Sequence, residues 1–147
     1  MSFYNLDYEE KRFIQLAKKN TRSYYEHHDR IPSSPGQVEL AKELVKEMKE
    51  LGLDAYYNEK TAFAIGKLSA NTAEKVTSIG FFAHVDTADF NAVNIKPQIH
   101  ENYDGQKIIL DEKDNIVLDP TEFPDLLNLK GQTLITSDGH TLLGVDD

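Results

Sequence analysis

The sequence contains no cysteine, and no apolar run among its 147 residues approaches the roughly 18 residues of a membrane-spanning helix. The lack of cysteine excludes disulfide bonds and thiolate metal sites, and it is typical of a reducing compartment. The opening stretch "MSFYNLDYEEKRF" has neither the basic start nor the apolar core of a signal peptide. We therefore expect a cytoplasmic protein that does not associate with membranes.

Basic residues are few relative to acidic ones. The 16 Lys and Arg against 25 Asp and Glu give a formal net charge of −9. Nucleic acid and anionic membranes would be repelled by this charge, so the sequence argues against both as partners. The hydrophobic content of 39% and charged content of 28% are those of an ordinary globular protein. The length is enough for one domain with a core of its own.

Two helices are predicted in the first third of the chain. Apolar residues at helical spacing predict the first over residues 3–20. A polar, proline-containing loop follows. The second helix begins after Ser34, where Gln37 three residues later is typical of a capping box, and an apolar stripe continues from there. Gly52 is expected to end this helix as its C-terminal cap.

After the second helix the hydrophobic period changes to that of β-strands. "DAYYNE", "TAFAIGKL" and "VTSIGFFAHV" are predicted to form three strands. The third is apolar on both faces, which predicts an inner strand covered on both sides. "ENYDGQKIIL" and "NIVLDP" predict a hairpin around "DEKDN", and "QTLIT" predicts a further short strand. The expected fold class is α/β, a mixed sheet flanked by helices.

The sequence ends on "LLGVDD" without the crossover helices that would cover the second face of such a sheet. We interpret it as a fragment of a longer enzyme, with a catalytic domain that is incomplete at the C-terminus. A truncated sheet leaves apolar surface or an unpaired edge exposed. Self-association is therefore expected.

The stretch "FFAHVDTADFN" is the first candidate for a functional site, because an apolar strand ends there in charged residues. Residues two apart in a strand point to the same side, so His84 and Asp86 would project together from the strand end, where α/β sheets gather their sites. A carboxylate beside a histidine suits a metal ligand with its orienting partner. The alternative for a bare His-x-Asp pattern is a solvated strand end.

The two terminal aspartates are the second candidate. Asp146 and Asp147 follow Gly144, where a closely packed backbone could deliver a carboxylate to a site. The alternative is an exposed turn or simply a chain end.

Other polar residues are interpreted as structural. Asp89 is expected to cap or shape a turn through its side-chain oxygens. Asn102 and Asp104 lie in "ENYDG", where an Asp-Gly turn accounts for part of the pattern and a role in binding substrate stays open. The remaining histidines are interpreted as exposed or turn residues without a metal role: His27, His28, His100 and His140.

Taken together, "FFAHVDTADFN", "ENYDG", "GQTLITSDG" and "TLLGVDD" resemble the peptidase T family of tripeptide aminopeptidases. These belong to the di-zinc metallopeptidases related to carboxypeptidase G and the aminoacylases. "NTRS", "PSSPGQVELAKEL" and "FAIGKLSAN" match as well, so the resemblance covers essentially the whole sequence in order. It implies that residues 1–147 are the N-terminal segment of the zinc-binding catalytic domain. The rest of that domain and the lid or dimerisation domain would then lie outside this sequence.

The resemblance also implies roles for individual residues. His84 matches a histidine that ligates one zinc, Asp86 the catalytic aspartate that orients this histidine, and Asp146 the aspartate that bridges two Zn²⁺ ions. Asp147 falls on the following position, which is not a ligand, and the choice of Asp146 rests on "GVDD" alone. The implied reaction is hydrolysis of a peptide bond by metal-activated water.

The implied function is a cytosolic metallo-aminopeptidase, a hydrolase that releases the N-terminal residue from small tripeptide substrates. The general-base glutamate and the other metal ligands of the family would lie beyond "GVDD". The 147-residue chain alone is therefore expected to bind zinc weakly and to be inactive, since a zinc site normally needs at least three protein ligands. The alternatives are a related dipeptidase or N-acyl amino acid hydrolase, and a truncated non-catalytic module.

Overall fold

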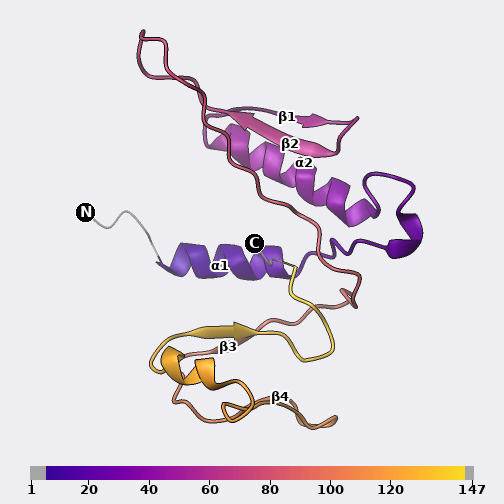
Figure 1. Ribbon diagram of the computed structural model, residues 1–147, viewed down its shortest axis with the longest axis vertical. Helices are drawn as coiled ribbons and strands as arrows, with labels where there is room; N and C mark the ends of the chain where they lie inside the picture. Colours follow the sequence, from indigo (N-terminus) through magenta and orange to yellow (C-terminus); the bar gives the residue numbers. More distant parts are fainter. Residues whose placement is uncertain (1–5, 145–147) are drawn as a thin grey trace. The chain divides into compact units, whose positions relative to one another are not determined.

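The computed structural model of the chain describes residues 6–144, which divide into two units (Figure 1). One unit consists of residues 21–89, and the other combines residues 6–20 with residues 90–144. Within the described residues, no helix is long and apolar enough to cross a membrane.

The unit of residues 21–89 is built from one helix packed on one hairpin (Figure 1). Helix α2 (Pro35–Glu50) lies along the antiparallel pair β1 (Asp54–Asn58) and β2 (Phe63–Lys67). The close approach is visible at Gly66, where an added Cβ would lie 2.5 Å from the sulfur of Met48. The buried apolar residues of this unit come from the helix and the first strand: Leu40, Ala41, Val45 and Ala55.

Helix α2 begins where the sequence predicts, but its N-terminus is capped differently. Ser34 has the extended backbone of an N-cap, followed by Pro35 at the first helical position, yet its side chain makes no capping hydrogen bond. The Gln37 side chain accepts the N–H of Ser33 at 3.0 Å, one residue before the position that a capping box uses. The predicted capping box is therefore wrong, because Gln37 turns toward the preceding loop.

The C-terminus of α2 follows the prediction. Gly52 has a φ of +87°, and its N–H donates to the Lys49 carbonyl at 3.0 Å. The N–H of Leu53 donates to the Met48 carbonyl at 2.9 Å. These two bonds form a Schellman motif, which satisfies helix carbonyls that would otherwise lack a partner.

The third predicted strand, "VTSIGFFAHV", is not formed. Residues 76–85 have no regular secondary structure, and Phe81 and Phe82 are 94% and 91% exposed. An inner strand needs a neighbour on each edge, and within residues 6–144 no strand pairs with this stretch. The α/β composition is confirmed, but the described strands form three antiparallel pairs and no single mixed sheet.

The exposed phenylalanines predict self-association of the 147-residue chain, since a contiguous apolar segment in water is an interaction surface. Light scattering at rising concentration should give masses above the monomer. The double variant Phe81→Ser with Phe82→Ser should shift the chain toward the monomer. Leu51 is 77% exposed and lies outside this apolar segment. Leu51→Ser is therefore the matched control and should leave the mass unchanged. A wild-type chain that stays monomeric throughout would contradict the prediction.

The second unit contains the remaining strands in two antiparallel pairs. Strand β3 (Gln98–His100) pairs with β6 (Leu134–Thr136), and β4 (Ile108–Asp111) pairs with β5 (Ile116–Leu118). The β4–β5 pair confirms the predicted hairpin, and β6 is the predicted short strand. A 3₁₀ helix η2 (Pro124–Leu129) connects β5 to β6. The buried apolar residues are Ala17, Ala92, Ile95, Tyr103 and Ile108.

Helix α1 (Leu6–Ala17) forms inside the predicted range and is closed by Gly144. The Gly144 N–H donates to the Ala17 carbonyl at 2.7 Å. An added Cβ at Gly144 would lie 2.5 Å from the Lys19 carbonyl oxygen and 2.8 Å from that of Leu16. Only glycine fits this approach, which confirms the closely packed backbone expected before the terminal aspartates.

An ion pair closes the open end of the β4–β5 hairpin. Lys107 Nζ lies 2.5 Å from Asp119 Oδ2, and Asp119 Oδ1 accepts hydrogen bonds from the N–H and hydroxyl of Thr121. The Lys107 contact, followed by the Thr121 hydrogen bonds, lowers the pKa of Asp119 from 3.8 to about 2. A carboxyl group with a lowered folded pKa stabilises the fold above its ordinary pKa, and this contribution is lost as the pH falls toward the folded value.

The contribution of the Asp119 charge to the stability difference between wild type and Asp119→Asn is therefore expected to be largest above about pH 4 and to disappear only below about pH 2. Denaturant unfolding at a series of pH values measures it, and Lys107→Met should show the same pH dependence. A difference that stays constant from neutral to acid pH would contradict this assignment.

Candidate metal-binding site

The predicted site residues are described in part. His84 and Asp86 lie in the unit of residues 21–89, His84 within the unpaired stretch of residues 76–85 and Asp86 directly after it, before the Thr87 bridge to Arg22. Asp146, the predicted bridging ligand, and Asp147 lie outside the described residues. The geometry below therefore concerns the histidine and its carboxylate partner.

The His84 ring is held from one side by Asp86. Its Nδ1 lies 2.9 Å from the backbone carbonyl oxygen of Asp86 and 3.3 Å from Oδ1 of the same residue. Both oxygens accept hydrogen bonds, so a neutral ring in this position is expected to carry its proton on Nδ1 and its lone pair on Nε2. A histidine prepared in this way binds a metal through Nε2. The pair comes together as the spacing predicts, although the segment is not a strand.

Asp86 is itself held by a segment far away in the sequence. Its Oδ2 accepts a hydrogen bond from the Ser23 hydroxyl at 2.5 Å. The backbones join beside this contact: Ser23 N–H donates to the Thr87 carbonyl at 2.9 Å, and Thr87 N–H donates to the Thr21 carbonyl at 3.2 Å. Thr21 and Thr87 are buried. The two carboxylate oxygens of Asp86 thus serve different partners, one the histidine and the other the serine.

Asp89 joins the same two segments. Its Oδ1 accepts a hydrogen bond from Arg22 Nε at 2.5 Å, and its Oδ2 accepts the N–H of Tyr25 at 3.1 Å. The Arg22 hydrogen bond, followed by that of Tyr25, lowers the pKa of Asp89. The predicted capping role is found, but the amide that Asp89 caps begins the 3₁₀ helix η1 (Tyr25–His27), 64 residues earlier.

The sequence does not indicate that residues 21–25 contact Asp86 and Asp89. Ser23 contacts Asp86, which lies 63 residues later in the sequence, and Arg22 contacts Asp89, which lies 67 residues later. Their only sequence signal is the short match "NTRS", which names no partner for either residue. Both contacts come from the segment of residues 21–25, which holds the side chains of Asp86 and Asp89 by hydrogen bonds.

His27, His28 and His100 each have a structural partner. His28 is exposed as predicted. His27 is half-buried, with Nδ1 2.8 Å from the Ser33 carbonyl oxygen. His100 is also half-buried, with Nε2 3.0 Å from the Thr136 hydroxyl across the β3–β6 pair. The prediction of exposure is therefore wrong for His27 and His100.

The loop "ENYDG" is a tight turn anchored by its tyrosine. Asp104 Oδ1 accepts the N–H of Gln106 at 2.8 Å, and Gly105 has a φ of +87°. The buried Tyr103 donates its hydroxyl to the Gln106 carbonyl at 2.8 Å, and burial raises its pKa. Asn102 and Asp104 both line a shallow surface hollow. Their role in substrate binding stays a prediction.

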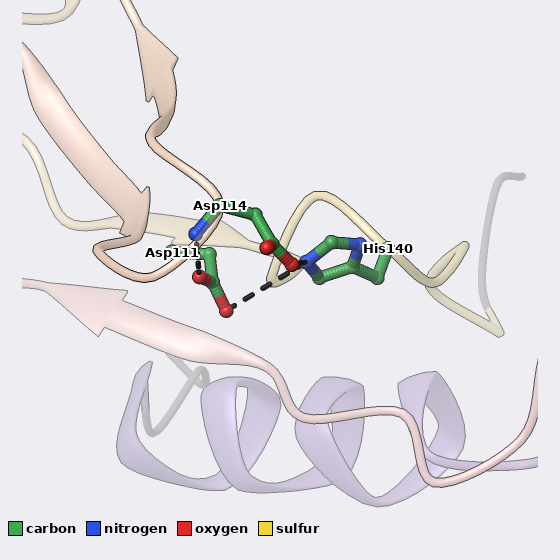
Figure 2. Close-up of side chains that lie close together, drawn as sticks. All are labelled: Asp111, Asp114 and His140. Atoms are coloured by element: carbon green, nitrogen blue, oxygen red, sulfur yellow. Dashed lines mark hydrogen bonds and ion pairs between the residues drawn. The ribbon is translucent and has the colours of Figure 1, made fainter.

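His140 takes part in a cluster that the sequence does not indicate (Figure 2). Its Nε2 lies 3.1 Å from Asp114 Oδ2 and 3.7 Å from Asp111 Oδ2. Among residues 6–144 this is the group of three whose ligand atoms all lie within 4.8 Å of one another. His140 is a turn residue as predicted, since Asp138 accepts its N–H at 3.0 Å. Its exposed side chain, however, reaches the hairpin turn between β4 and β5.

The comparisons with known proteins agree with the motifs. No family model matches the chain. A protein named peptidase T from Fusobacterium nucleatum is 52% identical over 137 residues, which are 93% of this chain and 33% of that protein. Proteins named peptidase T from Bacillus mycoides and Bacillus cereus are each 49% identical over 138 residues, with the same coverage. The chain spans about a third of the length of these relatives, and over nearly all of its own residues it is similar in sequence to proteins named peptidase T.

Proposed function

We propose that the chain is the N-terminal part of the zinc-binding domain of an aminopeptidase that releases the N-terminal residue from tripeptides. The observation that carries the proposal is the contact of the His84 ring through Nδ1 with Asp86, which supports Nε2 as the nitrogen that would bind the metal. The names of its relatives support a peptidase.

The donor chemistry of these residues fits zinc. Imidazole nitrogen and carboxylate oxygen are common zinc ligands, and a zinc-binding histidine typically donates its other ring N–H to a carboxylate or a backbone carbonyl. His84 has both of these acceptors at Nδ1. In the proposed site His84 and Asp146 hold the metal, and Asp86 keeps the imidazole in the tautomer that binds it.

The residues of this chain contribute binding and orientation. Bound zinc lowers the pKa of a water molecule and polarises the scissile carbonyl. Asp86 stabilises the imidazole while the positive charge of the metal lies against its other nitrogen. Of the ligands that each zinc needs, this chain supplies at most His84 and Asp146. We therefore expect the 147-residue chain to bind zinc weakly and to hydrolyse nothing.

A comparison of substrates tests the proposal. A full-length protein that contains this sequence should cleave tripeptides at the N-terminal bond, with much lower kcat/KM for dipeptides and N-acyl amino acids. A preference for dipeptides or for N-acyl amino acids would favour the related amidohydrolases instead. Absence of all three activities would favour the alternative that the protein is a non-catalytic module. The purified 147-residue chain is the internal control and should be inactive on every substrate.

The location of the protein stays a prediction. The cytoplasm is the compartment expected from the sequence, and small peptides are the partners expected from the proposed activity. Fractionation of cells followed by detection of the full-length protein would test the first expectation directly.

A further inference from the structure

We propose that Ser23 is a positioning residue, which orients Asp86 so that Asp86 can in turn orient His84. The inference deepens the proposed function and rests on it for the role of the histidine. Its geometric part concerns three side chains of one unit and stands on their contacts alone. Ser23 does not touch the metal or the substrate in this proposal.

The two oxygens of the Asp86 carboxylate face two different side chains. Oδ1 faces His84 Nδ1 at 3.3 Å, and Oδ2 accepts the Ser23 hydroxyl at 2.5 Å. The Asp86 side chain is 48% exposed, so packing alone does not fix the rotation of the carboxylate. The serine contact supplies this constraint, because turning the carboxylate toward water would break it.

The second step is the direction of the Ser23 hydrogen bond. Gln37 is buried, and its Oε1 accepts the Ser33 N–H at 3.0 Å, which fixes the orientation of the amide. The other end of the amide, Nε2, lies 3.2 Å from Ser23 Oγ and can only donate. The serine oxygen therefore accepts from Gln37, and its single proton is directed to Asp86.

The third step is the anchoring of the segment that carries Ser23. Gln37 Nε2 also lies 3.0 Å from Ser33 Oγ, 3.2 Å from the Thr21 carbonyl oxygen and 3.3 Å from that of Arg22, so its two protons are shared among these acceptors and Ser23 Oγ. Because Gln37 lies in the first turn of α2, these contacts anchor the segment of residues 21–25 to that helix. The result is a hydrogen-bond chain of fixed direction, from Gln37 through Ser23 and Asp86 to the His84 ring. Such networks hold side chains more firmly than single contacts do.

Removing the serine hydroxyl is expected to loosen His84 without releasing it. The backbone carbonyl oxygen of Asp86 still lies 2.9 Å from Nδ1, so one of the two acceptors is unaffected. We expect zinc affinity in the full-length protein to fall about three- to tenfold, less than the roughly 10–100-fold typical of deleting a direct partner of a metal ligand.

The test is nitrogen-detected NMR of the 147-residue chain with ¹⁵N-labelled histidine, which reports the tautomer of each ring. In the wild type, His84 should be mainly the Nδ1–H form. Ser23→Ala should shift it toward a mixture of tautomers, and Ser23→Thr, which keeps a hydroxyl, should restore the wild-type pattern. Ser137→Ala is the matched control, since it removes a serine hydroxyl that accepts the Gly139 N–H in the other unit.

A His84 pattern in Ser23→Ala that equals the pattern in Ser137→Ala would overturn the inference. Should Ser23→Ala fail to fold by circular dichroism, Ser23→Thr and Ser23→Val make the comparison, because they have similar shapes and differ in the hydroxyl. The NMR measurement needs neither zinc nor peptide. A full-length wild type that binds no zinc would therefore count against the proposed function, while the tautomer shift decides the positioning role separately.

Discussion

Gly144→Ala is expected to destabilise the unit of residues 6–20 and 90–144 by roughly 1–3 kcal/mol. The added Cβ would meet the carbonyl oxygens of Lys19, Leu16 and Ala17, at 2.5, 2.8 and 3.0 Å. These are backbone atoms at the end of α1, which cannot rotate away as a side chain can. The clash would also disturb the hydrogen bond from the Gly144 N–H to the Ala17 carbonyl. Either the helix end or the segment that leads to the terminal aspartates has to move.

Denaturant unfolding of the chain measures this effect. Gly80→Ala is the control, since a Cβ there meets only the Phe82 ring at an ordinary 3.7 Å. It should stay within about 0.5 kcal/mol of the wild type. In the full-length protein Gly144→Ala should also weaken zinc binding, because Asp146 follows two residues later. Equal stability of the two alanine variants would show that the close approach at Gly144 does not exist in solution.

His84→Ala in the full-length protein is expected to abolish peptide hydrolysis, since it removes a proposed ligand of the metal. Asp86→Asn should be the more informative change, because it keeps the shape of the side chain. Asparagine has a single oxygen, whereas His84 Nδ1 and the Ser23 hydroxyl are both donors directed at the carboxylate. At least one of the two donors therefore loses its hydrogen bond to a carboxylate oxygen, and we expect zinc affinity to fall about 10–100-fold.

Zinc affinity by competition with a chelator, together with the rate of tripeptide cleavage, checks both variants. His28→Ala is the matched control, because His28 is exposed and has no proposed ligand role. Its affinity and activity should equal those of the wild type. Hydrolysis at the wild-type rate by His84→Ala would show that His84 is not a ligand of the catalytic metal.

The elements that the sequence predicts are those with local signals. Helix α2 is framed by Pro35 and by the Schellman motif at Gly52, both within a few residues of its ends. The β4–β5 hairpin likewise joins segments that are neighbours in the sequence. The stretch of residues 76–85 has the composition of an inner strand, but the formation of such a strand depends on neighbouring strands that can come from distant parts of the sequence. Within residues 6–144 those neighbours are not present.

The same distinction holds for the candidate site. His84 and Asp86 are two residues apart, so their contact is local in sequence and forms without the predicted strand. Ser23 reaches Asp86 across 63 residues, and only the folded chain brings them together. The cluster of Asp111, Asp114 and His140 is also assembled by the fold, because the histidine lies in a different loop from the hairpin turn.

The most direct test of the account is anomalous diffraction at the zinc edge from crystals of the full-length, zinc-loaded protein. We expect zinc about 2.0–2.1 Å from His84 Nε2, with a carboxylate oxygen of Asp146 also bound. Asp86 and Ser23 should lie behind the ring as they do here. Anomalous density at Asp111, Asp114 and His140, with none beside His84, would contradict the account.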